Sequence, residues 1–194
     1  MYNILIRIFQ VEEMLEKPKK IRIPKKITKI RLQNVALYYL KRFDTTVQKL
    51  REVLKKRVRD YAHFDKDFDS REAYQWIEEI LEKFAECHYL DDSRYAENKV
   101  RGYLASGKSR RYIENKLREK GVEENVIGSC FDEMEYNPYE VALSFARKKK
   151  IGGFRNDEEK RKEMRQKDMG VLVRAGFEYD VVMKILDYLP EDEI

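Results

Sequence analysis

The chain has 194 residues, of which 40% are charged and 42% are apolar. A charged fraction so far above the usual value of about 25% is typical of solvent-exposed helices. The low counts of glycine (8) and proline (4) argue against a turn-rich β fold, and two cysteines are too few for a disulfide framework. No apolar stretch approaches the roughly 18 residues of a transmembrane helix. The sequence therefore predicts an all-α protein of the reducing cytoplasm that does not bind membranes.

The excess positive charge lies near the N-terminus. Residues 17–31 hold eight basic side chains and no acidic one, whereas the whole chain carries a net charge of +5. Pro18 and Pro24 disfavour a helix there and favour extended backbone. We therefore predict a basic arm over residues 1–33. Such an arm either attracts a polyanion such as nucleic acid or is a solvated leader without a partner.

One amphipathic pattern occurs three times along the rest of the chain. Apolar side chains recur at i, i+1, i+4, i+5 and i+8, starting from Trp76, Val126 and Val181. The second and third copies also share a lead-in, because Lys120-Gly121-Val122 matches Ala175-Gly176-Phe177. A helix that ends at glycine and is followed by an apolar residue fits both lead-ins. Each copy is therefore predicted to be a helix that packs against its neighbours.

Two parts of this pattern are irregular. In the first copy, Lys56-Arg57-Val58 stands at the place of the lead-in without a glycine, and the polar residues 59–71 look like an insert. In the third copy, the polar stretch 156–168 separates two expected helices. We interpret the first as an insert and the second as a longer stretch between helices.

We predict three tandem units of three helices. The middle helix begins at a hydroxyl cap, which is Thr45 or Thr46 in the first unit and Ser109 in the second. Units that bury their faces against one another tend to form extended arrays. The expected fold is all-α, with three three-helix repeats in an elongated, curved array after the basic arm. The boundaries are 1–33 for the arm and 34–88, 89–136 and 137–190 for the three repeats.

The sequence does not indicate a catalytic or metal site. The two histidines are His63 and His88, and the adjacent pair of Cys87 and His88 lacks the further spaced ligands that zinc needs. We interpret Cys87 and Cys130 as packing residues. No phosphate-binding or dinucleotide-binding glycine motif occurs, and the glycines of 150–154 are interpreted as a turn. We therefore expect no enzymatic activity and no cofactor.

Basic side chains gather at the expected helix ends of the second and third units. Cations at helix C-termini are favourable because of the helix dipole, and this accounts for about half of them. The other interpretation is a discontinuous cationic surface that faces nucleic acid or an acidic protein groove. The candidate contact residues are Arg110, Arg111, Arg118, Lys120, Lys148, Lys149, Lys150 and Arg155.

A helix-turn-helix over residues 109–134 is an alternative. Its second helix would begin with Glu123 and Glu124, whose negative charge opposes docking among phosphates. This alternative is therefore disfavoured. Four tyrosines fall on apolar faces and are interpreted as core residues before base-stacking platforms: Tyr39, Tyr95, Tyr103 and Tyr188.

Several separated motifs resemble one known family. Tyr89–Ala96 reads YLDDSRYA and looks like the LDD-x-R-[FY]-A signature of RecX regulatory proteins. Residues 107–122, which begin with GKSRRYI, extend the likeness, and Arg174–Asp180 (RAGFEYD) is similar to the R-x-G-F-x-Y element of that family. Ala36–Arg42 fits the opening helix of the family. The resemblance covers residues 34–190 in order, whereas the arm has no counterpart.

The resemblance implies a non-enzymatic modulator of the bacterial RecA recombinase. Such proteins bind RecA, and RecA filaments on single-stranded DNA, by lying along the helical groove of the filament. They inhibit filament growth together with its ATPase, strand-exchange and co-protease activities, in DNA repair, recombination and the SOS response. We expect a monomer without a cofactor and with weak direct binding to DNA. The alternative function is an autonomous nucleic-acid-binding protein that uses the basic arm.

Overall fold

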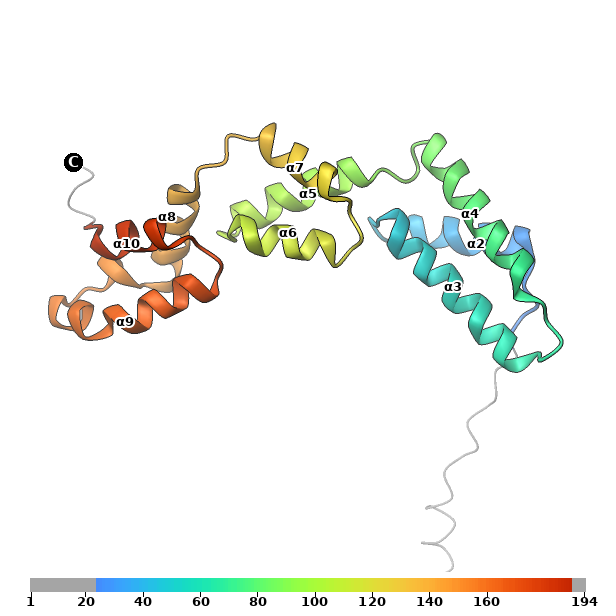
Figure 1. The fold of residues 1–194 in the computed structure, drawn as a ribbon, viewed down its shortest axis with the longest axis horizontal. Coiled ribbons are helices and arrows are strands. Elements are labelled where there is room, and N and C mark those ends of the chain that lie inside the picture. The colour runs from blue at the N-terminus through green and yellow to red at the C-terminus, as the bar shows by residue number, and fades with distance from the viewer. Residues whose placement is uncertain (1–23, 190–194) are drawn as a thin grey trace, which may run out of the picture.

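The structure, a computed structural model, describes residues 24–189, and most of the expected arm (1–23) and residues 190–194 lie outside them. Within the described range the chain forms α-helices, one 3-10 helix and no strand, in an elongated, bent arrangement (Figure 1). The all-α prediction is confirmed. In chain order the elements are α2 (Lys29–Leu40), α3 (Val47–Phe64), α4 (Ser70–Glu86), α5 (Asp92–Ala105), α6 (Arg110–Arg118), α7 (Glu124–Asp132), α8 (Pro138–Lys149), η1 (Gly152–Phe154), α9 (Glu158–Arg174) and α10 (Tyr179–Asp187).

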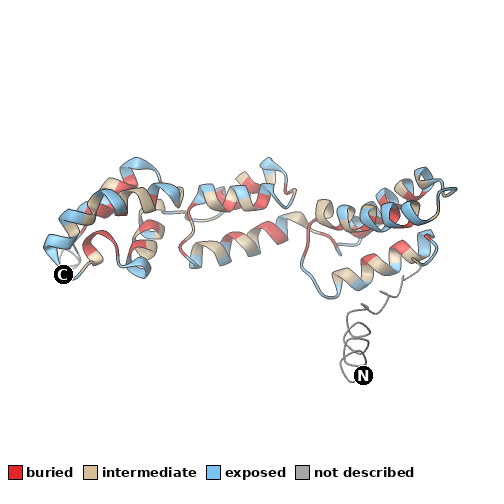
Figure 2. Ribbon diagram, turned by 90° about the horizontal axis from the view of Figure 1, so that it is seen from below, coloured by how far each residue is buried: buried red, intermediate tan, exposed pale blue. Residues whose placement is uncertain are grey.

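Buried side chains form three separate hydrophobic clusters. The first lies among α2, α3 and α4 around Leu54 and Ile77, and the second lies among α5, α6 and α7 around Ile113. The third lies among α8, η1, α9 and α10 around Leu172 and Ile185. We call these sets of elements the first, second and third helix groups. Figure 2 shows the buried residues on the inner faces of each group and the exposed residues outside.

The last residues of the expected arm belong to the first helix group. Thr28 caps α2, because its hydroxyl oxygen accepts the backbone N–H of Arg31 at 3.2 Å. Ile27 is only 6% exposed and packs in the first cluster. Both prolines that disfavour a helix precede this cap in the chain. The boundary expected after residue 33 therefore falls inside α2.

Most of the residues interpreted as an insert belong to two helices. α3 continues to Phe64, since Val58 and Tyr61 remain on its buried face. α4 begins directly after its cap Asp69. Phe68 precedes that cap and packs edge-on against Tyr61, with ring centroids 4.9 Å apart. Phe68 is thus the apolar residue that precedes the third helix of the first unit. We had assigned this position to Val58.

Most of the polar stretch of the third unit is also helical, so the expectation that it lies between helices is wrong. α9 starts after Asp157, whose carboxylate caps the helix by accepting a backbone N–H at 2.9 Å. The stretch is so rich in charge that it shows no clear amphipathic period. Asp168 and Leu172 nevertheless lie four residues apart on one buried face of this helix.

Two equivalent hydrogen bonds join consecutive helix groups. The hydroxyl of Thr46, the N-cap of α3, donates to the carbonyl oxygen of Lys120 at 2.5 Å. The hydroxyl of Ser109, the N-cap of α6, donates to the carbonyl oxygen of Ala175 at 2.6 Å. Each contact brings the N-terminus of one middle helix to the C-terminal end of the next, so the dipoles of α9, α6 and α3 attract one another (Figure 1). We call these contacts the first and second junctions.

Both junctions depend on glycine. Gly121 and Gly176 directly follow the accepting carbonyl groups and have φ angles of 76° and 90°. A Cβ at Gly121 would lie 2.4 Å from Cβ of Gln48, and a Cβ at Gly176 would lie 2.7 Å from Oγ of Ser109. The helix ends predicted at these glycines are confirmed. The glycines also let the neighbouring helix group approach, which the sequence did not indicate.

We expect Gly176→Ala to destabilise the protein by about 1–2 kcal/mol, because the positive φ disfavours alanine and the added Cβ meets Ser109. The measurement is urea denaturation followed by circular dichroism. Gly128→Ala in α7 is the control, since nothing lies within 4 Å of its added Cβ, and we expect it to be stabilising by about 0.5–1 kcal/mol. Equal denaturation midpoints for the two variants would contradict this account.

Candidate functional site

The candidate cations lie at the ends of helices, close to the two junctions or at the end of α8. The structure does not gather them into one pocket. They occupy the start of α6 at the second junction (Arg110, Arg111), the end of α6 at the first junction (Arg118, Lys120), the end of α8 (Lys148, Lys149, Lys150) and the residue after η1 (Arg155).

Arg155 is engaged inside the third helix group. Its guanidinium donates to the two carboxylate oxygens of Asp168 at 2.8 and 2.6 Å, and Asp168 is only 1% exposed. The backbone N–H of Gly152 donates to the same carboxylate at 3.0 Å. Burial pushes the pKa of Asp168 up, but the hydrogen bonds from Arg155 and Gly152 outweigh it and hold the pKa below its ordinary value. This buried pair fastens η1 to α9.

Arg118 and Arg110 form ion pairs on the surface of α6. Arg118 donates to the two carboxylate oxygens of Glu124, each at 2.7 Å, and these bonds lower the pKa of Glu124. Arg110 donates to Glu114 at 2.7 Å, and its guanidinium carbon lies 4.6 Å from the ring centroid of Phe131. Exposed ion pairs contribute about 0–1 kcal/mol. Both arginines can therefore exchange their acidic partner for another anion at little cost.

Lys148 connects the second and third helix groups. Its ammonium group donates to the carbonyl oxygen of Ala105, the last residue of α5, at 3.0 Å. Carbonyl groups at a helix C-terminus lack intrahelical partners and carry partial negative charge, so a cation is favourable there. Lys148 therefore supports the contact between two helix groups and is less available to a partner than its neighbours in the sequence.

Four candidate cations remain exposed and form neither an ion pair nor a side-chain hydrogen bond within residues 24–189. Arg111 lies at the second junction and Lys120 at the first, separated by the length of α6, which is about 13 Å for nine residues. Lys149 and Lys150 lie at the end of α8, where Lys150 has a φ of 55° as the C-cap. We call this set the free cations: Arg111, Lys120, Lys149 and Lys150.

A hollow of about 600 Å³ lies at the second junction next to Arg111. Tyr136 lines it and accepts the backbone N–H of Arg110 at 3.4 Å, while Tyr179, also in its wall, is 66% exposed. We did not predict either tyrosine as a site residue. The signal for Tyr179 was present, because it is the tyrosine of the RAGFEYD motif. Among the tyrosines interpreted as core, Tyr95 and Tyr188 are buried and Tyr39 and Tyr103 are half-buried.

The two cysteines differ in their surroundings. Cys130 is buried in the second cluster as expected, and burial raises the pKa of its thiol. Cys87 is exposed, so its interpretation as a packing residue is wrong. Between residues 24 and 189, no three histidine, cysteine or acidic side chains come together in a geometry that could hold a metal ion. None of the described helices has the length and apolar character that a membrane crossing requires.

Known proteins resemble this chain over most of its length. Residues 91–129 match the family described as RecX, second three-helix domain. The chain is 36% identical over 169 residues to regulatory protein RecX of Myxococcus xanthus, covering 86% of this chain and 90% of that protein. It is 31% identical over 163 residues to regulatory protein RecX of Agrobacterium fabrum, covering 82% and 84%. The crystal structure of RecX from Lactobacillus salivarius matches with a TM-score of 0.62 at 23% identity, covering 82% of this chain and 96% of that one.

Three helix groups, each with its own core and with cations near the joins, define an elongated helical-repeat protein. The identity to the Myxococcus and Agrobacterium proteins extends over most of each chain. This chain belongs to the RecX family of regulatory proteins, which are not enzymes. The resemblance inferred from the sequence motifs is therefore confirmed, and the matched residues 91–129 lie in the second helix group.

We expect Asp168→Asn to destabilise the protein by about 3 kcal/mol at pH 7, because it leaves the Arg155 guanidinium without its buried counter-charge. The pKa of Asp168 is lowered in the folded protein, so its contribution is complete above the ordinary value of 3.8 and disappears as the pH falls further. Thermal denaturation of wild type and variant should therefore show a difference in midpoint that is constant from pH 7 to the ordinary pKa of 3.8 and narrows as the pH falls below it. The exposed Asp180→Asn is the control, and a difference that narrows only above pH 3.8 would contradict the assignment.

Proposed function

We propose that this RecX-family chain, a modulator of the RecA recombinase, acts by lying along the helical groove of a RecA filament on single-stranded DNA. Each helix group contacts a different part of the filament, so several weak contacts act together. Binding in this position opposes filament growth and thereby lowers ATPase, strand-exchange and co-protease activities. The observation that carries the proposal is the end-to-end order of α9, α6 and α3 (Figure 1), because it extends the contact surface along one direction.

The proposal includes the division of the chain into three repeats, 34–88, 89–136 and 137–190. Two observations support it. The second and third repeats each contain one hydrophobic cluster, and the first repeat contains most of the remaining one, which also includes Ile27, Leu32 and Leu90. Thr46 and Ser109 also make the same kind of contact to the following helix group. A partner with regularly spaced, equivalent subunits fits such an arrangement.

The free cations supply charge complementarity to an acidic protein surface or to phosphates. Charges at the rim of an interface mainly accelerate association and make it sensitive to salt. Arg155 is not replaced together with the free cations, because its replacement would break the ion pair with the buried Asp168. Arg111, Lys120 and Lys149 can be replaced without loss of an ion pair within the described part of the chain.

A variant with Arg111→Ala, Lys120→Ala, Lys149→Ala and Lys150→Asn should need roughly tenfold more protein for half-inhibition of RecA, if each cation contributes a few tenths of a kcal/mol. Asparagine is chosen at residue 150 because it tolerates the positive φ there. The measurement is the ATPase rate of RecA on single-stranded DNA, with the variant titrated at low and at high salt. The difference from wild type should shrink at high salt.

The matched control removes four exposed cations of the first helix group that form no ion pair within residues 24–189. Circular dichroism checks that both variants keep their helices. Equal inhibition by wild type and the first variant, or an equal loss in both variants, would contradict the assignment of the free cations. The control substitutions to alanine are at Lys56, Arg59, Lys66 and Lys83.

Deletion of residues 1–23 separates this function from autonomous nucleic-acid binding by the arm. A longer deletion, to residue 31, would remove the α2 cap Thr28 and the buried Ile27, and so would damage the first helix group. We expect the shorter deletion to lower direct affinity for single-stranded DNA, measured by fluorescence anisotropy, and to leave inhibition of RecA within about twofold of wild type. Loss of both activities together would favour the alternative.

A further inference from the structure

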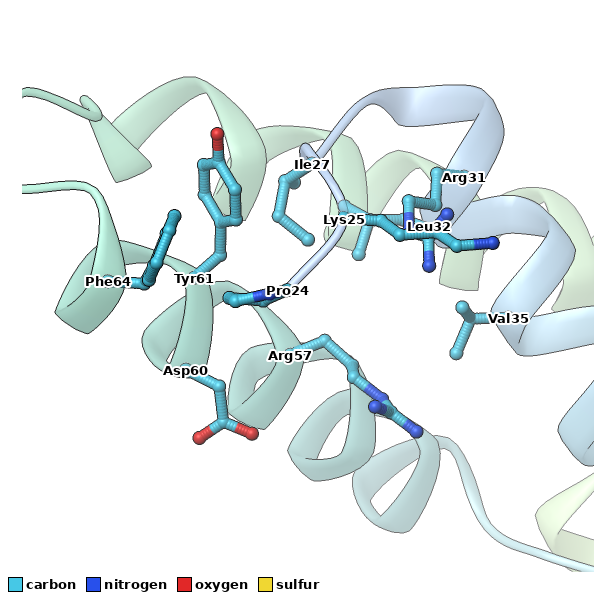
Figure 3. A pocket seen from close by; sticks show the side chains of 10 residues that line it. All are labelled: Pro24, Lys25, Ile27, Arg31, Leu32, Val35, Arg57, Asp60, Tyr61 and Phe64. Carbon is cyan, nitrogen blue, oxygen red and sulfur yellow. The ribbon is translucent and has the colours of Figure 1, made fainter. Parts of the chain in front are cut away.

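A groove at the outer end of the first helix group has no role in the proposed function. It encloses about 620 Å³ between the segment that leads into α2 and the C-terminal half of α3 (Figure 3). Ile27, Leu32 and Val35 form apolar lining on the α2 side. Phe64, at the end of α3, also lines the groove and is 51% exposed. Ile27 and Leu32 are buried by the first cluster, so the apolar surface that the groove exposes comes from the half-buried Val35 and above all from Phe64.

The charge around this groove is unbalanced. Three cations line it, Lys25 and Arg31 on the α2 side and Arg57 on the α3 side, against the single acid Asp60 (Figure 3). None of the three cations forms an ion pair with another described residue, although Lys29 nearby pairs with an acid of α4. An occupant that combines apolar and acidic side chains would therefore match both the lining and the charge.

Residues 1–16 of this chain have that composition. They contain apolar runs such as Ile4-Leu5-Ile6, and Glu12, Glu13 and Glu16 outnumber the single Arg7. Nucleic acid would match the cations of the groove but would leave the apolar lining unused. The composition of the groove therefore favours a peptide segment over a polyanion.

The position of this segment in the chain favours binding within one molecule. The described chain begins at Pro24, which itself lines the groove, so only residues 17–23 separate it from residue 16. Seven residues span at most about 25 Å, and a short tether holds its end at an effective concentration on the order of millimolar. A separate partner would have to compete against that concentration.

We propose that residues 1–16 bind this groove in the same molecule. Their acidic side chains neutralise Lys25, Arg31 and Arg57, and their apolar side chains cover Val35 and the ring of Phe64. The segment is thus the occupant of the groove at the outer end of the first helix group. A partner with a similar acidic and apolar segment would have to displace it in order to bind there.

Hydrogen exchange of the full chain, followed by mass spectrometry, tests the proposal. Amides of residues 1–16 should exchange roughly tenfold more slowly than in an unprotected peptide. Arg57→Glu should abolish this protection because it reverses a charge of the groove, and Phe64→Ala should weaken it because it removes apolar contact. Arg59→Glu is the matched control, since Arg59 is exposed on the same helix and does not line the groove, and it should keep the protection.

Three results would overturn the proposal. The first is an absence of protection in the wild type, or protection that Arg57→Glu leaves unchanged. The second is protection that disappears on dilution, which would assign the bound segment to a second copy of the chain. The third is unchanged exchange of residues 1–16 together with a loss of oligothymidylate binding in Arg57→Glu, which would assign the groove to nucleic acid. None of these measurements involves RecA, so failure of this proposal and failure of the proposed function are separate.

Discussion

The long-range order of the molecule depends on two hydroxyl groups that each serve two helices. A hydroxyl can donate one hydrogen bond and accept others at the same time. The oxygen of Thr46 accepts the backbone N–H of Lys49 at 3.1 Å while its hydrogen is directed to Lys120 in the next helix group. Ser109 does the same, with Tyr112 and Ala175 as its partners. The residue that caps the N-terminus of α3 or α6 therefore also bonds that N-terminus to the following helix group.

Because the three clusters are separate, the orientation of each helix group relative to the next depends on few contacts. The first junction has a further link, since the Asp92 carboxylate accepts the backbone N–H of Val47 at 2.9 Å, and burial raises the pKa of Asp92. The second junction has Lys148, which bonds the end of α5. Polar contacts thus determine how the groups are oriented, whereas apolar contacts determine how each group folds.

The features that were predictable from the sequence follow from strong apolar periods and from glycine. Ile77, Ile127 and Ile185 lie in buried stripes as expected, and Gly121 and Gly176 end helices. Helices made mainly of charged residues were missed, because α9 exposes charged side chains over most of its surface. The role of Arg155 was missed because its partner is thirteen residues away and buried by tertiary packing. Sequence alone therefore identified the candidate cations, but it did not show which of them already bind other residues of the protein.

The separation of the clusters also bears on how the chain reaches this shape. Each cluster is assembled from neighbouring stretches of sequence, so most apolar contacts are local and the contact order is low, which favours fast folding. A helix group can thus fold as soon as its own residues have left the ribosome, before the rest of the polypeptide is synthesised. A core substitution in one helix group should then destabilise mainly that group and the adjoining group, as in other linear arrays.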